Sequence, residues 1–272
     1  MSTDIAQFLW VEGRLSTMEQ LCLTSFLNNA YEVHLYTYGV VTDIPQGVTV
    51  KDGRKILPYS RIFQSEGSQG RNSSYTAFAD LFRLALLSQR GGWWFDMDMI
   101  CLQHLPPPKA LMFASTWEGE YGQCVSNCAI WSPAADPALT SLYESCNQLV
   151  LQKQSNLGFG ECGVHLLKHF IHGGSFIDAI APWWEFCPYP WRLVHRLAQR
   201  TLQEYAKDRL RGLKHRMRER IDQSFKAAYP RAHSRTLHFH NEIWQAMGYG
   251  KDERFFKLSD IEVYKKRSLR SR

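Results

Sequence analysis

The stretch from Phe78 to Leu102, FADLFRLALLSQRGGWWFDMDMICL, constrains the fold more than any other part of the chain. Its first half places apolar residues at helical spacings and ends at a Gly-Gly pair, where helices commonly stop. The run WWF that follows is typical of a buried strand. Two acids, Asp96 and Asp98, come directly after it. A helix, a tight turn and a buried strand that ends in paired acids indicate an α/β fold with polar chemistry at one edge of a sheet.

The N-terminal segment predicts the same class of fold. Residues 5–10 are expected to form a strand, residues 16–29 a helix that starts at a serine, and residues 31–39 a second strand with alternating apolar positions. A strand, a helix and a strand in this order form a βαβ unit, and such units build parallel sheets. We expect one domain over residues 1–272, because a chain of this length can bury a core of its own.

A strongly basic segment lies outside this pattern. Residues 191–226 carry eleven Lys and Arg against four acids, with apolar residues at helical spacings between them. We expect a basic helical excursion from the domain. It is consistent either with a solvated helical face or with a platform that contacts an anionic membrane surface or an acidic glycan. No nucleic-acid-binding module is recognisable, so we expect no nucleic-acid partner.

The cysteines and the hydropathy pattern indicate a compartment. The seven cysteines include no C-x-x-C pair, which predicts free thiols in a reducing environment. The sequence has no apolar run long enough for a transmembrane helix, and its N-terminus lacks the features of a secretory signal. We therefore expect a cytoplasmic protein, and peripheral contact with the inner face of the membrane through the basic segment stays open.

The acids after the strand suggest a divalent metal. Carboxylate oxygens suit Mn²⁺ or Mg²⁺, which keep coordination sites for a diphosphate. A D-x-D sequence alone is common by chance, but Asp80 and Arg83 lie just upstream, three residues apart on an otherwise apolar helix. A structural salt bridge is the plain alternative. A buried ion pair stabilises a fold poorly, however, so a role beside the acids explains the pair better.

These residues resemble the signature of the DXD-containing sugar-transferase family, whose members include yeast initiating mannosyltransferases, α1,4-galactosyltransferases and the catalytic domains of clostridial glucosylating toxins. The family pattern A/S-D-x-x-R, then G-G-x-Y-x-D-x-D, stands here as residues 79–83 and 91–98. Residues 8–38 resemble the family's opening strand and helix. Residues 237–244, LHFHNEIW, resemble its closing H-x-x-N-x-x-W element. The resemblance spans most of the chain and leaves the basic segment outside.

The resemblance implies a GT-A-type, Rossmann-like mixed sheet flanked by helices. It also implies retaining, metal-dependent transfer of a hexose or N-acetylhexosamine from a nucleotide sugar, with UDP expected. The acceptor would be a glycan or glycolipid; we expect a bacterial surface polysaccharide, and a protein acceptor stays open.

The resemblance further assigns roles to individual residues. Asp96 and Asp98 would hold Mn²⁺ or Mg²⁺ and the donor diphosphate, with Asp98 the more direct ligand. Asp80 would accept hydrogen bonds from the donor sugar, and Arg83 would contact the sugar and the diphosphate.

Aromatic and C-terminal residues complete the expected site. Trp10 would stack on the base, and Trp94, which replaces the usual tyrosine before the acids, would contact the donor. Trp244 would donate its indole N–H to the leaving phosphate. The candidates that complete the metal shell are His238, His240 and Asn241.

One departure from the family pattern affects the acceptor side. The family's Gly-Pro loop is replaced by GFGECG, with Glu161 in the proline's place. The resemblance implies attack on the same face of the sugar as the leaving group, with the leaving phosphate as the base. A nucleophile such as Glu161 stays an alternative.

Two other functions stay open at this point. A phosphatase of the D-x-D type attacks phosphorus with its first aspartate, and WWFDMDMI fits its apolar strand. That class usually carries the motif close to the N-terminus, and it leaves Asp80 and Arg83 unexplained. The other alternative is a non-catalytic protein that binds a sugar nucleotide or glycan.

Overall fold

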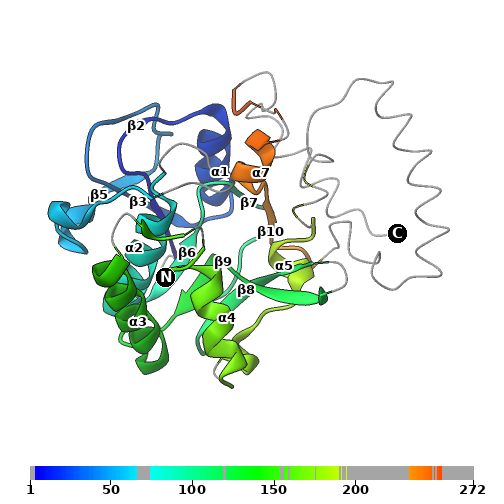
Figure 1. The fold of residues 1–272 in the computed structure, drawn as a ribbon. Coiled ribbons are helices and arrows are strands. Elements are labelled where there is room, and N and C mark those ends of the chain that lie inside the picture. The colour runs from blue at the N-terminus through cyan, green and yellow to red at the C-terminus, as the bar shows by residue number, and fades with distance from the viewer. Residues whose placement is uncertain are drawn as a thin grey trace.

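The centre of the molecule is a six-stranded mixed sheet. This computed structural model describes residues 4–65, 74–118, 121–153, 156–158, 160–174, 176–189, 191, 194, 233–246, 248 and 250–252. The sheet is ordered β5-β3-β1-β6-β9-β8 (Figure 1). Its strands are β1 (Ile5–Leu9), β3 (Glu32–Thr37), β5 (Thr49–Asp52), β6 (Gly92–Phe95), β8 (Met112–Trp117) and β9 (Gln123–Ser132).

Helices and short strands surround this sheet. The helices are α1 (Thr17–Leu27), α2 (Thr76–Arg90), α3 (Pro137–Lys153), α4 (Val164–His172), α5 (Trp183–Phe186) and α7 (Asn241–Ala246), with 3-10 turns η1 (Gly53–Lys55), η2 (Tyr59–Arg61) and η6 (Ile177–Ala179). Two small sheets pair β2 (Gly13–Arg14) with β4 (Val41–Thr42), and β7 (Met99–Cys101) with β10 (Thr236–His238).

The predicted βαβ opening is confirmed. β1 pairs in parallel with β3 and also with β6, whereas β9 runs antiparallel to both β6 and β8. The connecting helix α1 starts at a capping box formed by Ser16 and Glu19, which satisfies free backbone N–H groups at the helix start. The prediction of an α/β protein with a mixed sheet flanked by helices is therefore also confirmed.

Alternating side chains along the strands build a core on each face of the sheet. Phe8 of β1 packs with Phe26 of α1 and Phe95 of β6 on one face. Tyr36 of β3 packs with Phe82 of α2 on the other. Period-two alternation in a strand produces this division, and it fixes α1 and α2 on opposite faces.

The turn from α2 into β6 requires a glycine. Gly91 has a φ of 65°, and a Cβ there would lie 2.4 Å from the backbone nitrogen of Ala134. A side chain would therefore be strained and would also clash. The turn feeds β6 into the middle of the sheet, so that Asp96 follows at the strand's carboxyl end.

The C-terminal strand β10 lies next to the segment that follows Asp96 and Asp98, the two residues of the acidic turn. β10 pairs antiparallel with β7, with His238 opposite Met99, and the two strands lie beside each other in Figure 1. This brings the closing H-x-x-N-x-x-W element against the D-x-D segment.

The structure also bears on the predictions about the cysteines, a membrane-spanning helix and the basic segment. The seven cysteines are all free, as predicted. None of the helices in the described part of the chain has the length and apolarity that a bilayer crossing requires. The predicted basic excursion at residues 191–226 lies outside the described residues, apart from Trp191 and Val194. The single domain over residues 1–272 stays a prediction.

Candidate functional site

A tight turn brings the two acids to one place. The backbone N–H of Asp96 donates to the Cys128 carbonyl at 2.8 Å, and the N–H of Met99 donates back to the Asp96 carbonyl at 3.2 Å. Side chains one residue apart on a strand point to opposite faces, but Asp98 lies in a hydrogen-bonded turn and not on the strand. Ligand atoms of Asp96, Asp98 and His238 all lie within 4.8 Å of one another. The structure therefore brings both acids and His238 together, and the metal-binding role expected of them stays a prediction.

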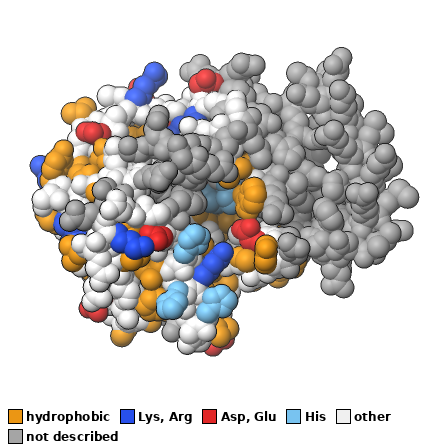
Figure 2. Space-filling view, viewed as in Figure 1, with side chains coloured by type: hydrophobic (Ala, Val, Ile, Leu, Met, Phe, Trp, Pro, Cys, Tyr) orange, Lys and Arg blue, Asp and Glu red, His pale blue; other side chains and the backbone are white. Residues whose placement is uncertain are grey.

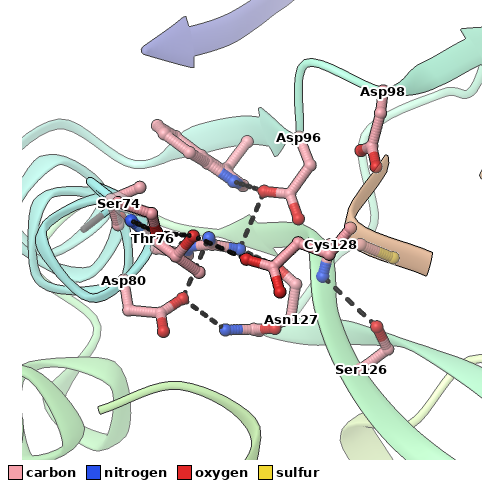
Figure 3. A network of polar contacts seen from close by, with 12 residues as sticks. Ser74, Thr76, Asp80, Asp96, Asp98, Ser126, Asn127 and Cys128 are labelled. Carbon is pink, nitrogen blue, oxygen red and sulfur yellow. Dashed lines mark hydrogen bonds and ion pairs between the residues drawn. The ribbon is translucent and has the colours of Figure 1, made fainter. Parts of the chain in front are cut away.

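A buried arginine links helix α2 to this turn. Figure 3 shows the acids Asp80, Asp96 and Asp98 of this region, with Asn127 beside Asp80. The guanidinium of Arg83 lies 2.9 Å from a carboxylate oxygen of Asp80 and 2.9 Å from one of Asp96. Arg83 also donates to the backbone carbonyl of Asn127, and the Asn127 side chain donates to Asp80 at 2.9 Å. The Asp80 and Arg83 side chains are each only 5% exposed. The charges of Asp80 and Arg83 are therefore paired inside the protein, and the guanidinium of Arg83 is held beside Asp96.

Trp94 supports Asp96 from behind. Its indole N–H donates to Asp96 Oδ1 at 2.9 Å, and the Arg83 guanidinium lies 5.1 Å from its ring centre. The side chain is 2% exposed. The structure thus places Trp94 against Asp96 and Arg83, and the donor contact expected of Trp94 stays a prediction.

Asp98 is held on both of its oxygens by the C-terminal segment. Oδ1 lies 3.2 Å from Nε2 of His238, and Oδ2 accepts the backbone N–H of Asn241 at 2.7 Å. The Asn241 side chain accepts a hydrogen bond from Gln245. Asn241 therefore reaches the acids through its backbone, whereas His238 reaches them through its ring.

His240 stands next to the expected metal shell. Its ring lies 3.9 Å from that of His238, centre to centre, and its backbone has a φ of 49°. Its Nε2 is buried without a hydrogen-bond partner among the residues that the structure describes. Burial and the neighbouring His238 lower the pKa of His240 well below its ordinary value. The ring is therefore neutral and keeps a nitrogen lone pair that a metal ion could use.

The two acids differ in their affinity for a proton. Burial raises the pKa of Asp96 to about 7, with Arg83 opposing and Asp98 adding to the rise. Burial acts on Asp98 too, but the charge and hydrogen bond of His238 outweigh it and lower the pKa of Asp98. The pKa of His238 is raised for the reciprocal reason, against the effect of its burial. A cation placed between the acids would relieve the repulsion that Asp98 exerts on Asp96.

Two further tryptophans, Trp10 and Trp244, are expected to contact the donor. Trp10 follows β1, and the Lys251 ammonium lies 5.4 Å from the centre of its ring. Trp244 is fully buried, and its indole N–H donates to the Gly250 carbonyl at 2.8 Å. The structure therefore points this N–H at Gly250 rather than at the acids, and the phosphate contact expected of Trp244 would require that hydrogen bond to break. Base stacking on Trp10 stays a prediction.

Glu161 makes its contacts away from the acids. Its carboxylate accepts from Lys153 at 2.7 Å and from the Gly158 backbone N–H at 2.8 Å, and these contacts hold the pKa of Glu161 below its ordinary value. The Lys153 and Glu161 side chains are 42% and 33% exposed. The contacts described for Glu161 do not join it to the acidic turn.

We expect Glu161→Gln to leave the turnover of a sugar donor within about threefold of the wild-type rate. Its contacts, to Lys153 and Gly158, do not join it to the acidic turn, and its exposed ion pair contributes little to the stability of the fold. The measurement is the steady-state rate of donor turnover, with Glu144→Gln on α3 as a control for removing one carboxylate. A loss of several orders of magnitude in Glu161→Gln alone would restore the nucleophile hypothesis.

Asn127 and Gly163 belong to the site although no motif indicated them. A Cβ at Gly163 would lie 2.4 Å from Asp80 Oδ2 and 2.7 Å from Asn127 Nδ2. The three residues also line a cavity of about 10 Å³ with Arg83, which is room for one water molecule. A sugar hydroxyl that reaches Asp80 therefore requires this cavity to open. Gly163 is needed because of a close approach, which only the folded structure reveals.

Alanine at position 163 is expected to lower donor turnover about tenfold or more, because small misplacements of positioning groups are costly. The added methyl group would push Asp80 and Asn127 away from Arg83. Gly173→Ala at the other end of α4 is the matched control, since its nearest neighbour would lie at 3.4 Å. Equal steady-state rates in the two variants would contradict the expectation.

The surface near α4 is mixed rather than of one charge. Figure 2 shows acidic, basic and apolar side chains interspersed, with histidines gathered over α4. Three exposed residues of that helix are His165, His169 and His172.

Comparisons with known proteins agree with the motif. Residues 19–117 match the family model described as glycosyltransferase sugar-binding region containing DXD motif. The predicted resemblance is thereby confirmed over these residues. A search of curated protein sequences found no match.

Solved structures show a more remote likeness. The PaToxG glycosyltransferase is 13% identical with a TM-score of 0.45, over 98% of this chain and 86% of that one. The apo-form glycosyltransferase GlyE of Streptococcus pneumoniae TIGR4 is 14% identical with a TM-score of 0.44, over 97% of this chain and 64% of that one.

Proposed function

We propose, starting from the match of residues 19–117 to the sugar-binding region of DXD glycosyltransferases, that this protein is a metal-dependent, retaining glycosyltransferase. The match supports sugar transfer as the reaction. The donor we propose is a UDP-sugar that carries a hexose or N-acetylhexosamine, and the acceptor a glycan or glycolipid. The observation that carries the proposal is the convergence of Asp96, Asp98 and His238 within 4.8 Å, beside the buried Arg83.

The side chains at the turn fit a divalent cation. Asp96, Asp98 and His238 would hold Mn²⁺ or Mg²⁺, with His240 and Asn241 next to them. Carboxylates and waters suit these hard ions, and the His238 imidazole would complete the set. When bound, the ion supplies positive charge next to the diphosphate, where negative charge grows as the sugar departs.

The protein's own cation would act on the same charge. Arg83 is fixed by Asp80, Asn127 and Asp96, so its position needs little reorganisation during the reaction, and such preorganised groups stabilise developing charge well. We propose that Arg83 contacts the diphosphate side of the donor and that Asp80, once its cavity opens, accepts a sugar hydroxyl. Trp10 would stack on the base.

The structure favours this reading over a D-x-D phosphatase. That mechanism needs the first aspartate free to attack phosphorus. Here Asp96 Oδ1 already accepts from both Arg83 and Trp94, at 2.9 Å each, and this arrangement suits an anchored ligand better than a nucleophile.

The test is a panel of nucleotide sugars incubated with the full chain and Mn²⁺, with released nucleotide and free sugar as separate readouts. Without an acceptor, we expect slow hydrolysis of one donor with equimolar release of nucleoside diphosphate and free sugar. With a suitable acceptor, we expect faster release of nucleoside diphosphate, with the sugar found on the acceptor rather than free in solution. Release of inorganic phosphate instead would support the phosphatase. Donor binding without release, with every acceptor class tried, would support a non-catalytic binding protein.

A further inference from the structure

Two cysteines and a histidine meet in the core directly behind the acidic turn. The Sγ atoms of Cys128 and Cys187 lie 3.5 Å apart, and Cys187 Sγ lies 3.9 Å from Nδ1 of His238. The three ligand atoms all lie within 4.8 Å of one another. The three residues are 1%, 0% and 8% exposed. They come from β9, from the end of α5 and from β10, so the fold alone brings them together.

Their spacing is close to that of ligands around one tetrahedral ion. Zn–S bonds of about 2.3 Å and Zn–N bonds of about 2.0 Å place neighbouring sulfurs about 3.8 Å apart and a sulfur and a nitrogen about 3.5 Å apart. The observed separations of 3.5 Å and 3.9 Å differ from these by a few tenths of an ångström. A disulfide would require the sulfurs to close to about 2.05 Å, and it would leave the imidazole nitrogen unexplained.

We propose that Cys128, Cys187 and His238 Nδ1 form a second metal site, which takes a thiophilic divalent ion of the zinc class. Sulfur and imidazole donors select such ions, whereas carboxylates and waters select Mn²⁺ and Mg²⁺. The two sites therefore differ in the ion they prefer. Three protein ligands leave one tetrahedral position for a further ligand, a pattern known for Cys₂His zinc centres.

The two sites share the His238 ring, which would ligate both ions only as an imidazolate, after its N–H proton has passed to solvent. Nε2 of His238 lies 3.2 Å from Asp98 Oδ1, while Nδ1 faces the sulfurs. An ion on the sulfur side would fix the ring that faces the acids, and it would join β9, α5 and β10. It would act as a staple for the segment that holds Asp98.

Plain core cysteines are the alternative, because a free cysteine packs like a small hydrophobic residue. That reading explains each thiol alone. It gives no reason for an imidazole nitrogen to face two sulfurs in an apolar core, since thiols are weak hydrogen-bond partners.

The test uses Co²⁺, a spectroscopic substitute for zinc. It is added to the metal-free full chain in a phosphine reductant, and no sugar nucleotide is present. We expect thiolate-to-cobalt charge-transfer absorption that saturates at one thiolate-bound Co²⁺ per chain, whether or not the acidic turn also binds Co²⁺, and that Zn²⁺ abolishes. Cys187→Ser and Cys128→Ser should each lose this absorption. Cys124→Ser, the same change on the same strand, should keep it, and so should Asp98→Asn. The readout needs no turnover, so it stands or falls independently of sugar transfer.

Two outcomes would overturn the proposal. One is that the reduced wild-type chain binds no Co²⁺, or binds it without thiolate absorption. This outcome is measured on the wild type, so it does not depend on whether a variant folds. The other is thiolate absorption that persists in both Cys128→Ser and Cys187→Ser. A disulfide between Cys128 and Cys187 in protein kept without reductant, together with no cobalt signal after reduction, would instead identify a redox pair.

Discussion

Replacing Asp98 by asparagine is expected to lower donor turnover at least about a hundredfold, a loss typical of removing one group that stabilises developing charge. Asparagine keeps the size of the side chain but removes its charge. One terminal atom of the new side chain must also accept the backbone N–H of Asn241, whose nitrogen lies 2.7 Å from Oδ2 of Asp98. The amide oxygen has to take that place, which leaves the NH₂ group on the other side. Both effects weaken the hold on a cation. The measurement is the rate of nucleotide release at saturating Mn²⁺ and donor.

A matched change elsewhere separates this effect from a general loss of charge. Asp178→Asn alters an exposed aspartate in η6 and should retain the wild-type rate. Circular dichroism should show both variants folded. A folded Asp98→Asn protein with undiminished release would remove Asp98 from the site.

Replacing Arg83 by methionine is expected to lower the free energy of unfolding by about 3–5 kcal/mol, as removal of one partner from a buried ion pair commonly does. Methionine fills similar space but leaves the Asp80 and Asp96 carboxylates without the cation that lies 2.9 Å from each. Arg83→Lys should recover only part of the loss, because an ammonium cannot reproduce the fork that bridges both acids. Urea unfolding followed by tryptophan fluorescence measures the difference.

The control is Arg54→Met, which removes another arginine paired with an aspartate. Arg54 lies 2.8 Å from Asp52, but its side chain is 61% exposed. Its removal should leave the urea midpoint nearly unchanged, since exposed ion pairs contribute little. Equal midpoints for the two methionine variants would show that Arg83 does not neutralise the buried acids.

Local patterns made the central segment predictable. The apolar spacing of α2, the glycines after it and the short strand β6 all lie within one continuous stretch. Local propensity and tertiary structure agree there, so the end of β6 and its acids are found where the sequence predicts them. The same agreement explains the success with β1, α1 and β3.

Features that depend on distant contacts could not be predicted in this way. Cys128 and Cys187 are 59 residues apart, and nothing in the sequence around either one indicates a partner. Asn127 joins Asp80 across 47 residues. The resemblance implies that Trp94 contacts the donor, and the fold buries its side chain against Asp96 and Arg83. Trp244 is expected to donate its indole N–H to the leaving phosphate, and the fold supplies the Gly250 carbonyl as an acceptor for it.

Calorimetric titration of a UDP-sugar into the metal-free full chain, without and with Mn²⁺, tests most directly whether the acidic turn holds the donor through a cation. If the donor diphosphate binds through the cation, each of the two ligands must strengthen the binding of the other. We therefore expect Mn²⁺ to tighten donor binding in the wild type and to have no such effect in Asp98→Asn. Donor binding that is equally tight with and without Mn²⁺, or that is strengthened by Mn²⁺ as much in the variant as in the wild type, would contradict it.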